Sequence, residues 1–148
     1  MTSDVAAKYL PLLERFRAGK RTGLARAITV VENEQSGFEA FLHEVLSVGP
    51  SAARVGVTGP PGAGKSSLLS MLAAHYRAAD EEVGVVAVDP TSPYSGGALL
   101  GDRIRMNDLA TDPGIFIRSM ATRGSLGGLA TTSKEVIDLM DSFGIPRI

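Results

Sequence analysis

Residues 59–66 read Gly-Pro-Pro-Gly-Ala-Gly-Lys-Ser, and the interpretation of the whole chain starts from this stretch. It satisfies the pattern G-x-x-x-x-G-K-[ST], in which a glycine-rich turn leads into a helix and directs backbone N–H groups at phosphate oxygens. The glycines allow backbone angles and a close approach to a ligand that a Cβ atom would prevent. The stretch therefore predicts a phosphate-binding loop.

The sequence on both sides of this motif has the character that such a loop requires. The β-branched run at 54–58 predicts a strand before it, and apolar residues recur at helical spacing over 68–76 after it. A second strand is expected at 83–88, where the continuous apolar run is typical of a parallel strand buried on both faces. Strand, loop, helix and strand together predict a βαβ unit.

The chemistry of the motif indicates a nucleotide and a magnesium ion. Lys65 supplies a point charge for the β- and γ-phosphates and is the candidate catalytic residue, and Ser66 offers an oxygen ligand to Mg²⁺. The helix that opens near Gly64 adds unpaired N–H groups and a positive dipole end. The residues expected to hold the nucleotide are Gly59, Gly62, Ala63, Gly64, Lys65, Ser66 and Ser67.

Two aspartates are candidates for the metal environment. Asp89 ends the second strand, at the carboxyl edge where ligands bind in open α/β sheets, and is placed to hold a magnesium-bound water. A turn-forming role before Pro90 is the alternative. Asp102 follows a glycine-rich loop and either reaches the metal when that loop closes over the γ-phosphate or caps the next helix. Both interpretations stay open for each aspartate.

Composition narrows the remaining classes of function. The 148 residues carry 15 Lys and Arg against 16 Asp and Glu, a net charge of −1, so no global basic field attracts nucleic acid or an anionic membrane. The absence of cysteine excludes a catalytic thiol and every cysteine-ligated metal site within the chain. The sequence shows neither a membrane-length apolar run nor a signal peptide, so a cytoplasmic location is expected.

Residues 1–50 are expected to form a helical extension, followed over 51–148 by the N-terminal portion of an α/β nucleotide-binding domain. Apolar residues recur at helical spacing in three stretches of the extension, with Gly19 as a stop for the first. Ser36 with Glu39 has the spacing of a capping box, as does Thr132 with Glu135 further on. We expect the three helices to pack as a cap on the following domain; a partner-binding stripe is the alternative.

The last third of the chain alternates again between loop, helix and strand. A helix is expected from Asp102 to the break at 112–114, a short strand at 115–117, and a helix that ends at Gly144. A parallel α/β unit then needs a return strand, which would begin at 146–148. The sequence therefore indicates an incomplete sheet; a helix followed by a short ordered tail is the alternative.

Four stretches in this order resemble one family of proteins. They are residues 59–67, 88–92, 96–106 and 116–128, which read GPPGAGKSS, VDPTS, GGALLGDRIRM and FIRSMATRGSLGG. They are similar to the G-proteins associated with methylmalonyl-CoA mutase, also known as ArgK-type or LAO/AO transport system ATPases. The similarity spans nearly the whole chain, including the helical extension.

The resemblance implies a three-layer α/β/α P-loop NTPase fold with a parallel sheet. It implies a GTPase that acts as a chaperone of an adenosylcobalamin-dependent mutase, uses GTP or GDP with Mg²⁺, and forms a homodimer when full length. By this resemblance residues 62–67 bind phosphates, Ser66 ligates Mg²⁺, and Asp89 and Asp102 belong to the metal and switch environment. The family's next strand with its acidic residue, its guanine-reading loop and its dimerisation arm would lie beyond Ile148.

Other functions remain open on the residues alone. The motif at 59–66 equally permits a P-loop ATPase or a small-molecule kinase, because the phosphate contacts do not depend on the base. A nucleotide-binding fragment without catalysis is a further alternative. Arg103, Arg105, Arg118 and Arg123 lie near the expected loops, either as charge stabilisers or as solvated surface residues, and His43 and His75 lie in helices without a catalytic setting.

Overall fold

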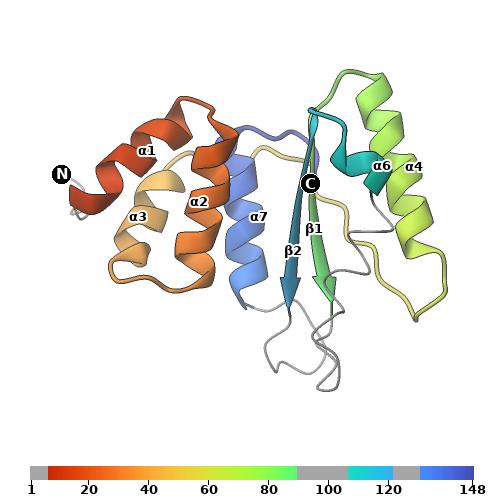
Figure 1. Cartoon of the computed structure of the whole chain (residues 1–148), viewed down its shortest axis with the longest axis horizontal. Coiled ribbons are helices and arrows are strands. Elements are labelled where there is room, and N and C mark those ends of the chain that lie inside the picture. Colours follow the sequence, from red (N-terminus) through yellow and green to blue (C-terminus); the bar gives the residue numbers. More distant parts are fainter. Residues whose placement is uncertain (1–6, 90–106, 122–130) are drawn as a thin grey trace.

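The computed structural model describes residues 7–89, 107–121 and 131–148. Helices on both faces of a small parallel sheet give the α/β layering shown in Figure 1, with α7 on one side of the strands and α4 on the other. The elements in chain order are η1 (Ala7–Tyr9), α1 (Leu10–Arg17), α2 (Arg21–Glu32), α3 (Phe38–Val45), α4 (Lys65–Ala78), β1 (Val83–Asp89), α6 (Asn107–Ala110), β2 (Ile115–Ala121) and α7 (Thr131–Phe143).

The sheet consists of β1 and β2, which pair in parallel with Val83 opposite Ile115 and Asp89 opposite Ala121. The expected strand at 83–88 is confirmed and gains Asp89. The strand expected at 115–117 extends to Ala121, because each further residue pairs with the next position of β1. Side chains alternate along β1, so Val83 and Val85 contribute to the core towards α4, while Val86 packs against the core towards α7.

The strand expected at 54–58 is not formed. Residues 54–58 carry no strand assignment. A β-bridge joins the preceding residue, Ala53, to Arg147, and the N–H of Val55 donates to the Ile148 carbonyl at 2.8 Å. Arg147 also bridges Val83, so the segment and β1 run on opposite sides of residues 146–148. A run of β-branched residues becomes a strand only where a neighbouring backbone supplies its hydrogen bonds, and the segment has that neighbour at its first residues.

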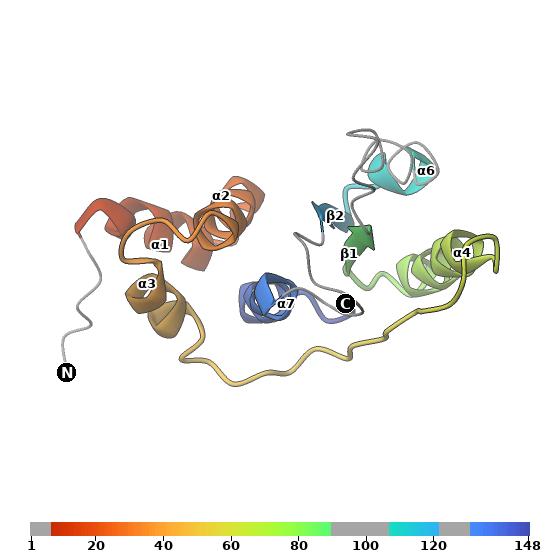
Figure 2. The same ribbon diagram turned by 90° about the horizontal axis from the view of Figure 1, so that it is seen from below.

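Helices α1, α2, α3 and α7, here called the helical unit, share one core. Its largest fully buried side chains include Phe41, Leu24, Ile28 and Leu139, all at 0% exposure. The ring of Phe16 packs edge-on against Phe143 of α7, with ring centroids 5.3 Å apart. The expected helical extension therefore packs against α7, as the cap interpretation predicts, and Figure 2 shows α1, α2 and α3 grouped on one side of α7.

The helix ends match the sequence at glycines and differ from it at the expected capping boxes. Gly144 follows α7, and the N–H of Ile145 donates to the Met140 carbonyl at 3.2 Å, as in a glycine-terminated helix. The Ser36 capping box is wrong, because Gly37 is the N-cap of α3 and makes no side-chain cap bond. Thr132 lies inside the first turn of α7, which begins at Thr131, so the second capping box is also wrong.

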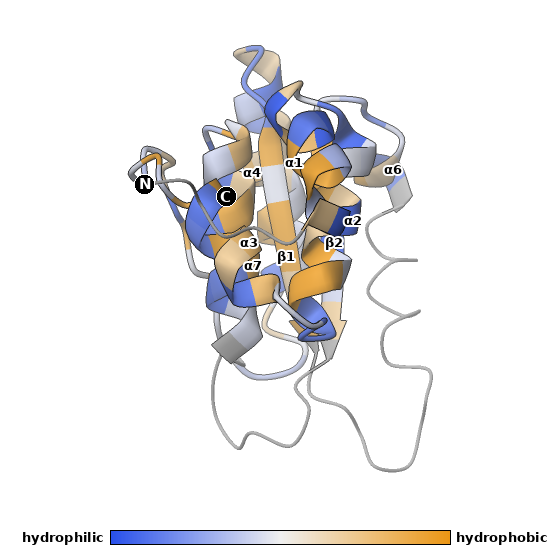
Figure 3. Cartoon of the chain, turned by 90° about the vertical axis from the view of Figure 1, so that its left-hand side faces the viewer, coloured by the Kyte–Doolittle hydropathy of each residue, from blue (hydrophilic) through white to orange (hydrophobic). Residues whose placement is uncertain are grey.

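Among the described residues, no helix combines the length and the apolar character needed to cross a membrane. In Figure 3 the helices of the helical unit carry both hydrophilic and hydrophobic residues, whereas β1 is mainly hydrophobic. This colouring fits helices with one solvated face and a strand covered on both sides.

Candidate phosphate-binding site

The loop at 59–64 has the backbone that the motif predicts. Gly62 and Gly64 adopt φ angles of 77° and 86°, in the left-handed region that residues with a Cβ atom rarely enter. A Cβ atom added at either position would meet nothing within 4 Å, so the backbone angle, rather than lack of space, explains the glycines. The loop therefore turns sharply into α4, and Figure 1 shows it at the end of the molecule towards which both strands point.

The start of α4 is open to an anion. Gly64 is its N-cap and makes no side-chain cap bond, and the N–H of Leu68 donates to the Gly64 carbonyl at 3.0 Å. In α-helical geometry the N–H groups of the preceding residues, Lys65 to Ser67, have no carbonyl one turn back within the helix. Together with the positive end of the helix dipole, these groups can donate to phosphate oxygens.

The side chain of Lys65 folds back onto the loop and binds two backbone carbonyl groups there. Its ammonium group donates to the carbonyl oxygens of Gly59 at 2.7 Å and Pro60 at 2.8 Å. The aliphatic part of the side chain lies against Gly59, where a Cβ atom would meet the Lys65 Cδ at 3.8 Å. The positive charge is thus kept at the loop, close to the open helix start, and a phosphate group would compete with the two carbonyls for it.

The metal assignments receive different support. Ser66 lies in the first turn of α4 beside Lys65, where its hydroxyl can serve as one oxygen ligand of Mg²⁺, an ion that keeps several of its waters. Asp89 is the last residue of β1, at the same end of the molecule as the loop (Figure 1). Asp102 lies outside the described residues. Those residues contain no group of three or more His, Cys, Asp or Glu side chains suited to a metal ion.

Residues that the sequence did not single out position the segment leading to the loop. Asp141 of α7 has 2% of its side chain exposed, and its Oδ1 accepts from the backbone N–H groups of Ser51 at 2.9 Å and Ala52 at 3.0 Å. Arg54 bridges α7 by donating to Asp141 and Asp138, each at 2.8 Å. No spacing in the sequence marks these pairs, because their members are more than eighty positions apart.

The pKa shifts of Asp141 and Arg54 both favour the charged forms of these two side chains. Burial of the Asp141 carboxyl opposes ionisation, but the N–H group of Ser51 and the Arg54 guanidinium outweigh it and hold its pKa below the ordinary value. The Asp141 carboxylate in turn raises the pKa of Arg54. A buried charge that is paired on both oxygens fixes the backbone near Ser51 to α7.

Of the four candidate arginines, the structure describes Arg118. Arg118 on β2 forms an ion pair with Glu32 of α2 and has 25% of its side chain exposed, so it is partly buried. The interpretation of Arg118 as a freely solvated surface residue is therefore wrong: opposite charge on the helical unit holds it. Arg103, Arg105 and Arg123 lie outside the described residues.

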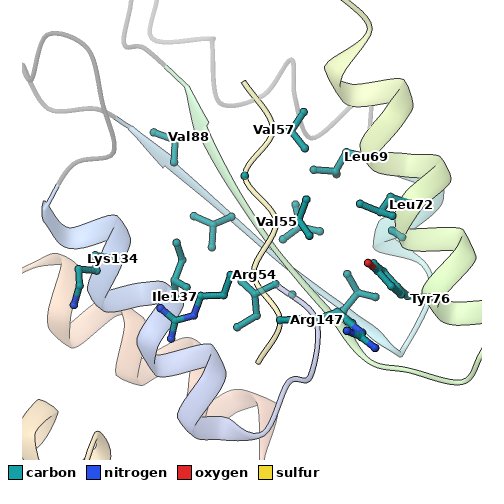
Figure 4. Close-up of a pocket in the computed structure, with 18 residues that line it drawn as sticks. Arg54, Val55, Val57, Leu69, Leu72, Tyr76, Val88, Lys134, Ile137 and Arg147 are labelled. Atoms are coloured by element: carbon teal, nitrogen blue, oxygen red, sulfur yellow. The ribbon is translucent and has the colours of Figure 1, made fainter. Parts of the chain in front are cut away.

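A cleft lies beside the loop and not in it. It has a volume of ≈ 480 Å³ and runs between the extended segment 53–57 and β1, with Leu72 and Tyr76 of α4 on one wall (Figure 4). Ile137 of α7 lines the opposite wall. The lining of the cleft is mainly aliphatic, and its charged residues are Arg54, Lys134 and Arg147.

Comparison with known proteins agrees with the motif. Residues 24–148 match the family described as methylmalonyl-CoA mutase-associated GTPase. A protein of Pyrococcus horikoshii named "Putative GTPase" is 53% identical over 133 residues, which is 90% of this chain and 42% of that protein. The GTPase ArgK of Escherichia coli is 40% identical over 136 residues, covering 89% of this chain and 41% of that one.

A mouse protein named "Methylmalonic aciduria type A homolog, mitochondrial" is 38% identical over 140 residues, or 85% of this chain and 34% of its own. The chain thus spans about two fifths or less of the length of these relatives, and corresponds to their N-terminal part.

Proposed function

The chain belongs to the methylmalonyl-CoA mutase-associated GTPase family, and from this premise we propose that residues 59–67 bind the phosphates of GTP and GDP. The observation that carries the proposal is the loop geometry. Gly62 and Gly64, both in the left-handed region, precede α4, whose N-cap makes no side-chain hydrogen bond. The ammonium group of Lys65 is hydrogen-bonded within the same loop. A positive charge and outward-facing N–H groups within one turn of helix are a recognised arrangement for a polyphosphate.

Each predicted residue has a role in this proposal. Lys65 exchanges the carbonyls of Gly59 and Pro60 for phosphate oxygens and thereby stabilises charge that develops on the γ-phosphate. The N–H groups at the start of α4 bind the remaining phosphate oxygens. Ser66 supplies one oxygen ligand to Mg²⁺, and Asp89 and Asp102 hold the ion through its waters.

Beyond nucleotide binding, we propose the role that the family's description suggests. GTP hydrolysis by the whole protein would serve a methylmalonyl-CoA mutase-type enzyme, which depends on adenosylcobalamin, and the whole protein would act as a homodimeric, cytoplasmic chaperone of it. The family match and the names of the relatives support a GTPase linked to such a mutase, and one relative is mitochondrial. The chaperone role, the homodimer and the cytoplasmic location rest on the sequence resemblance and composition. ATP hydrolysis is the second candidate, because the phosphate contacts at 59–67 serve either base.

The binding proposal is tested by calorimetric titration of this chain with GTP, GDP and ATP, each with and without Mg²⁺. Lys65→Ala removes the only side-chain cation hydrogen-bonded to the loop among the described residues, so we expect loss of measurable GTP and GDP binding. Lys20→Ala is the matched control, because Lys20 is the N-cap residue of α2, in the helical unit, and its side chain makes no cap hydrogen bond. Unchanged affinity in Lys65→Ala would remove the phosphate-loop assignment.

The metal part has a separate readout. Asp89→Asn is expected to weaken the dependence of nucleotide binding on Mg²⁺ while the melting temperature of the nucleotide-free chain stays nearly the same. A large fall in melting temperature with normal magnesium dependence would assign Asp89 to the turn before Pro90. Tight ATP binding without GTP binding would favour the second candidate and leave the phosphate loop intact.

A further inference from the structure

The loop at 59–64 is attached to the rest of the chain at two ends, and the two attachments differ in firmness. Its last residue passes directly into α4, in which only Ala73 is buried while Leu68 and Met71 are 55% and 72% exposed. A helix with few buried contacts gives a weak hold on the loop before it. The attachment at the other end of the loop, through the segment at 51–54, is made to α7.

The attachment before the loop centres on Asp141 of α7, whose side chain is 2% exposed. Its Oδ1 accepts from the N–H groups of Ser51 at 2.9 Å and Ala52 at 3.0 Å. Its Oδ2 accepts from Arg54 at 2.8 Å, and a second guanidinium nitrogen of Arg54 donates to Asp138, three residues earlier on α7, also at 2.8 Å. Two carboxylates and one guanidinium thus tie this segment to a single helix.

The packing of α7 makes it a rigid support for this attachment. Val136, Leu139 and Met140 on its inner face have 0% exposure, and the ring of Phe143 packs edge-on against Phe16 of α1. Such a helix opens rarely, because opening would expose much of the core that it shares with the helical unit. The start of the loop is therefore held to the helical unit, whereas its end depends on the less covered α4.

Little else among the described residues holds the chain between this attachment and the loop. The N–H of Val55 donates to the Ile148 carbonyl at 2.8 Å, and the backbone hydrogen bonds between described residues include none at 56–58. The five residues from Arg54 to Gly59 reach about 17 Å when extended. Release of the segment from α7 would therefore leave most of the approach to the loop free to shift.

A shift of this approach affects how well the loop can bind phosphate. Hydrogen bonds from the loop and from the start of α4 weaken steeply when a donor moves away from its acceptor or out of line with it. A loop that samples several arrangements also loses that freedom when it binds a ligand, and this cost lowers the affinity. An anchor that limits those arrangements beforehand raises the affinity without touching the ligand.

We propose that Asp141 is a positioning residue for the phosphate loop: with Arg54 it fixes the segment before the loop to α7 and so keeps the loop ready for the phosphates of a nucleotide. Asp141 itself contacts no nucleotide and acts through the backbone of residues 51–54. The inference rests on the proposed function of residues 59–67 and adds to it a residue on a helix outside the loop.

A second carboxylate of the chain provides a matched control. Asp112 also accepts from a backbone N–H, that of Gly114 at 2.7 Å, and from an arginine, Arg77, at 3.1 Å. Arg77 lies near the end of α4, about 18 Å along the helix axis from Lys65. Asp112→Asn therefore alters a contact of the same chemistry at a place away from the loop.

The test measures by calorimetry the affinity of the 148-residue chain for GDP with Mg²⁺ and for inorganic pyrophosphate, and by urea denaturation the stability of each variant. Asp141→Asn places an amide donor against Arg54 and is expected to weaken both affinities about tenfold. The two ligands should lose equally, because the anchor acts on the phosphate loop and not on the base. Asp112→Asn should lower the stability and leave both affinities unchanged.

A readout without ligand separates positioning from stability. In the nucleotide-free chain, NMR order parameters at the amides of Gly62 and Gly64 are expected to fall in Asp141→Asn and to stay the same in Asp112→Asn. Arg54→Gln, at a side chain that is 35% exposed, is the milder variant if Asp141→Asn does not fold. The double variant should lose no more affinity than Asp141→Asn alone, because the two side chains act as one contact.

The possible outcomes distinguish this inference from the proposed function. Unchanged affinities in Asp141→Asn and Arg54→Gln would overturn the positioning role and leave the phosphate loop assigned. Equal weakening in Asp141→Asn and Asp112→Asn would reduce the effect to general stability and overturn it as well. Failure of the unaltered chain to bind GDP or pyrophosphate would remove the proposed function, and this inference with it.

Discussion

The helical unit and the sheet side of the molecule, made of β1, β2, α4 and α6, bury their apolar residues to very different extents. Among the described residues, a continuous core of sixteen buried residues lies mainly between the helices of the helical unit and includes Leu24, Val31 and Leu139 at 0% exposure, with Met120 of β2 at its edge. On the sheet side five buried residues form the core, and Leu68 and Met71 of α4 are 55% and 72% exposed. The two regions are built from similar residues but are covered unequally.

The cause of this difference lies in the partners that each face meets. The first core is enclosed by four helices on one side and by residues of β1 and β2, among them Val86 and Met120, on the other. On the sheet side, α4 faces a sheet of two strands with a cleft beside it, and the extended segment 53–57 carries Val55 at 50% exposure. The side of the molecule that carries the loop at 59–64 therefore buries less of its apolar surface than the helical unit.

The largest expected effect tests this inequality with the same substitution in both regions. Leu139→Ala in α7 should lower the free energy of unfolding by about 2–5 kcal/mol, because the side chain is fully buried in a closed core. Leu69→Ala in α4 should cost about 1 kcal/mol, since the residue is half-buried and lines the cleft, where its surroundings can relax. Urea denaturation followed by circular dichroism measures both changes.

Equal decreases in the free energy of unfolding for Leu139→Ala and Leu69→Ala would contradict the comparison of the two regions. Native-state hydrogen exchange supplies an independent check, because amides of α2 and α7 should be more strongly protected than those of α4.

The next effect concerns the contact of Asp141 in α7 with the segment at 51–54 that leads to the loop. Asp141→Asn keeps the shape of the side chain but replaces one carboxylate oxygen with a donor facing Arg54, so we expect a loss of about 1–3 kcal/mol. Glu14→Gln in α1 is the control, because Glu14 is exposed. A loss no larger than that of the control would show that the Asp141 network does not stabilise the fold.

The same network predicts how stability depends on pH. The pKa of Asp141 is lower in the folded chain than its ordinary value, so the carboxylate stabilises the fold above its unfolded pKa, near 3.9, and this stabilisation is lost as the pH falls through the lower folded pKa. The N–H of Gly114 likewise lowers the pKa of Asp112, which adds to the same acid limb. Urea titrations between pH 2 and pH 7 should show a shallower acid limb in Asp141→Asn than in the unaltered chain.

The smallest expected effect on stability is at the exposed face of α4. Leu68→Ser with Met71→Ser should change the free energy of unfolding by less than about 1 kcal/mol in total, because both side chains are largely exposed. Self-association at high protein concentration should nevertheless decrease, since an exposed apolar patch favours contact between copies. Sedimentation velocity measures the self-association, with Leu10→Ser on α1 as the control. An equal decrease in self-association in the control would show that the exposed face of α4 is not its cause.

Much of the fold could be predicted because its signals are local. The turn at 59–64, the buried run at 83–88 and the helical spacing around Leu24 each depend on residues close in sequence, and the structure confirms the corresponding elements. The expected roles of Asp102 and of the loops around it fall outside the described residues. Assignment of the chain to its family likewise followed from short ordered stretches, and the family match confirms it.

The wrong predictions share a physical origin. The segment 54–58 has strand-forming residues, but a strand requires a hydrogen-bonded neighbour, and only residues near Ala53 have one. Ser36 with Glu39 has a capping spacing, yet the hydroxyl of Tyr9 donates to the Ser36 carbonyl at 2.8 Å and α3 starts from Gly37. Arg118 cannot be told from a surface arginine until Glu32 of α2 is seen beside it.

By itself the sequence determined the glycine-rich turn at 59–64, most of the helices, the strands that begin at Val83 and Ile115, and the family, because each follows from residue type and short-range spacing. Only the tertiary structure decided that Asp141 anchors the segment before the loop, and that residues 146–148 lie between that segment and β1. It also decided that the apolar surface of α4 and the cleft remain partly uncovered. These contacts join residues more than sixty positions apart, and such distances are set by packing and hydrogen bonding of the folded chain, which no local pattern records.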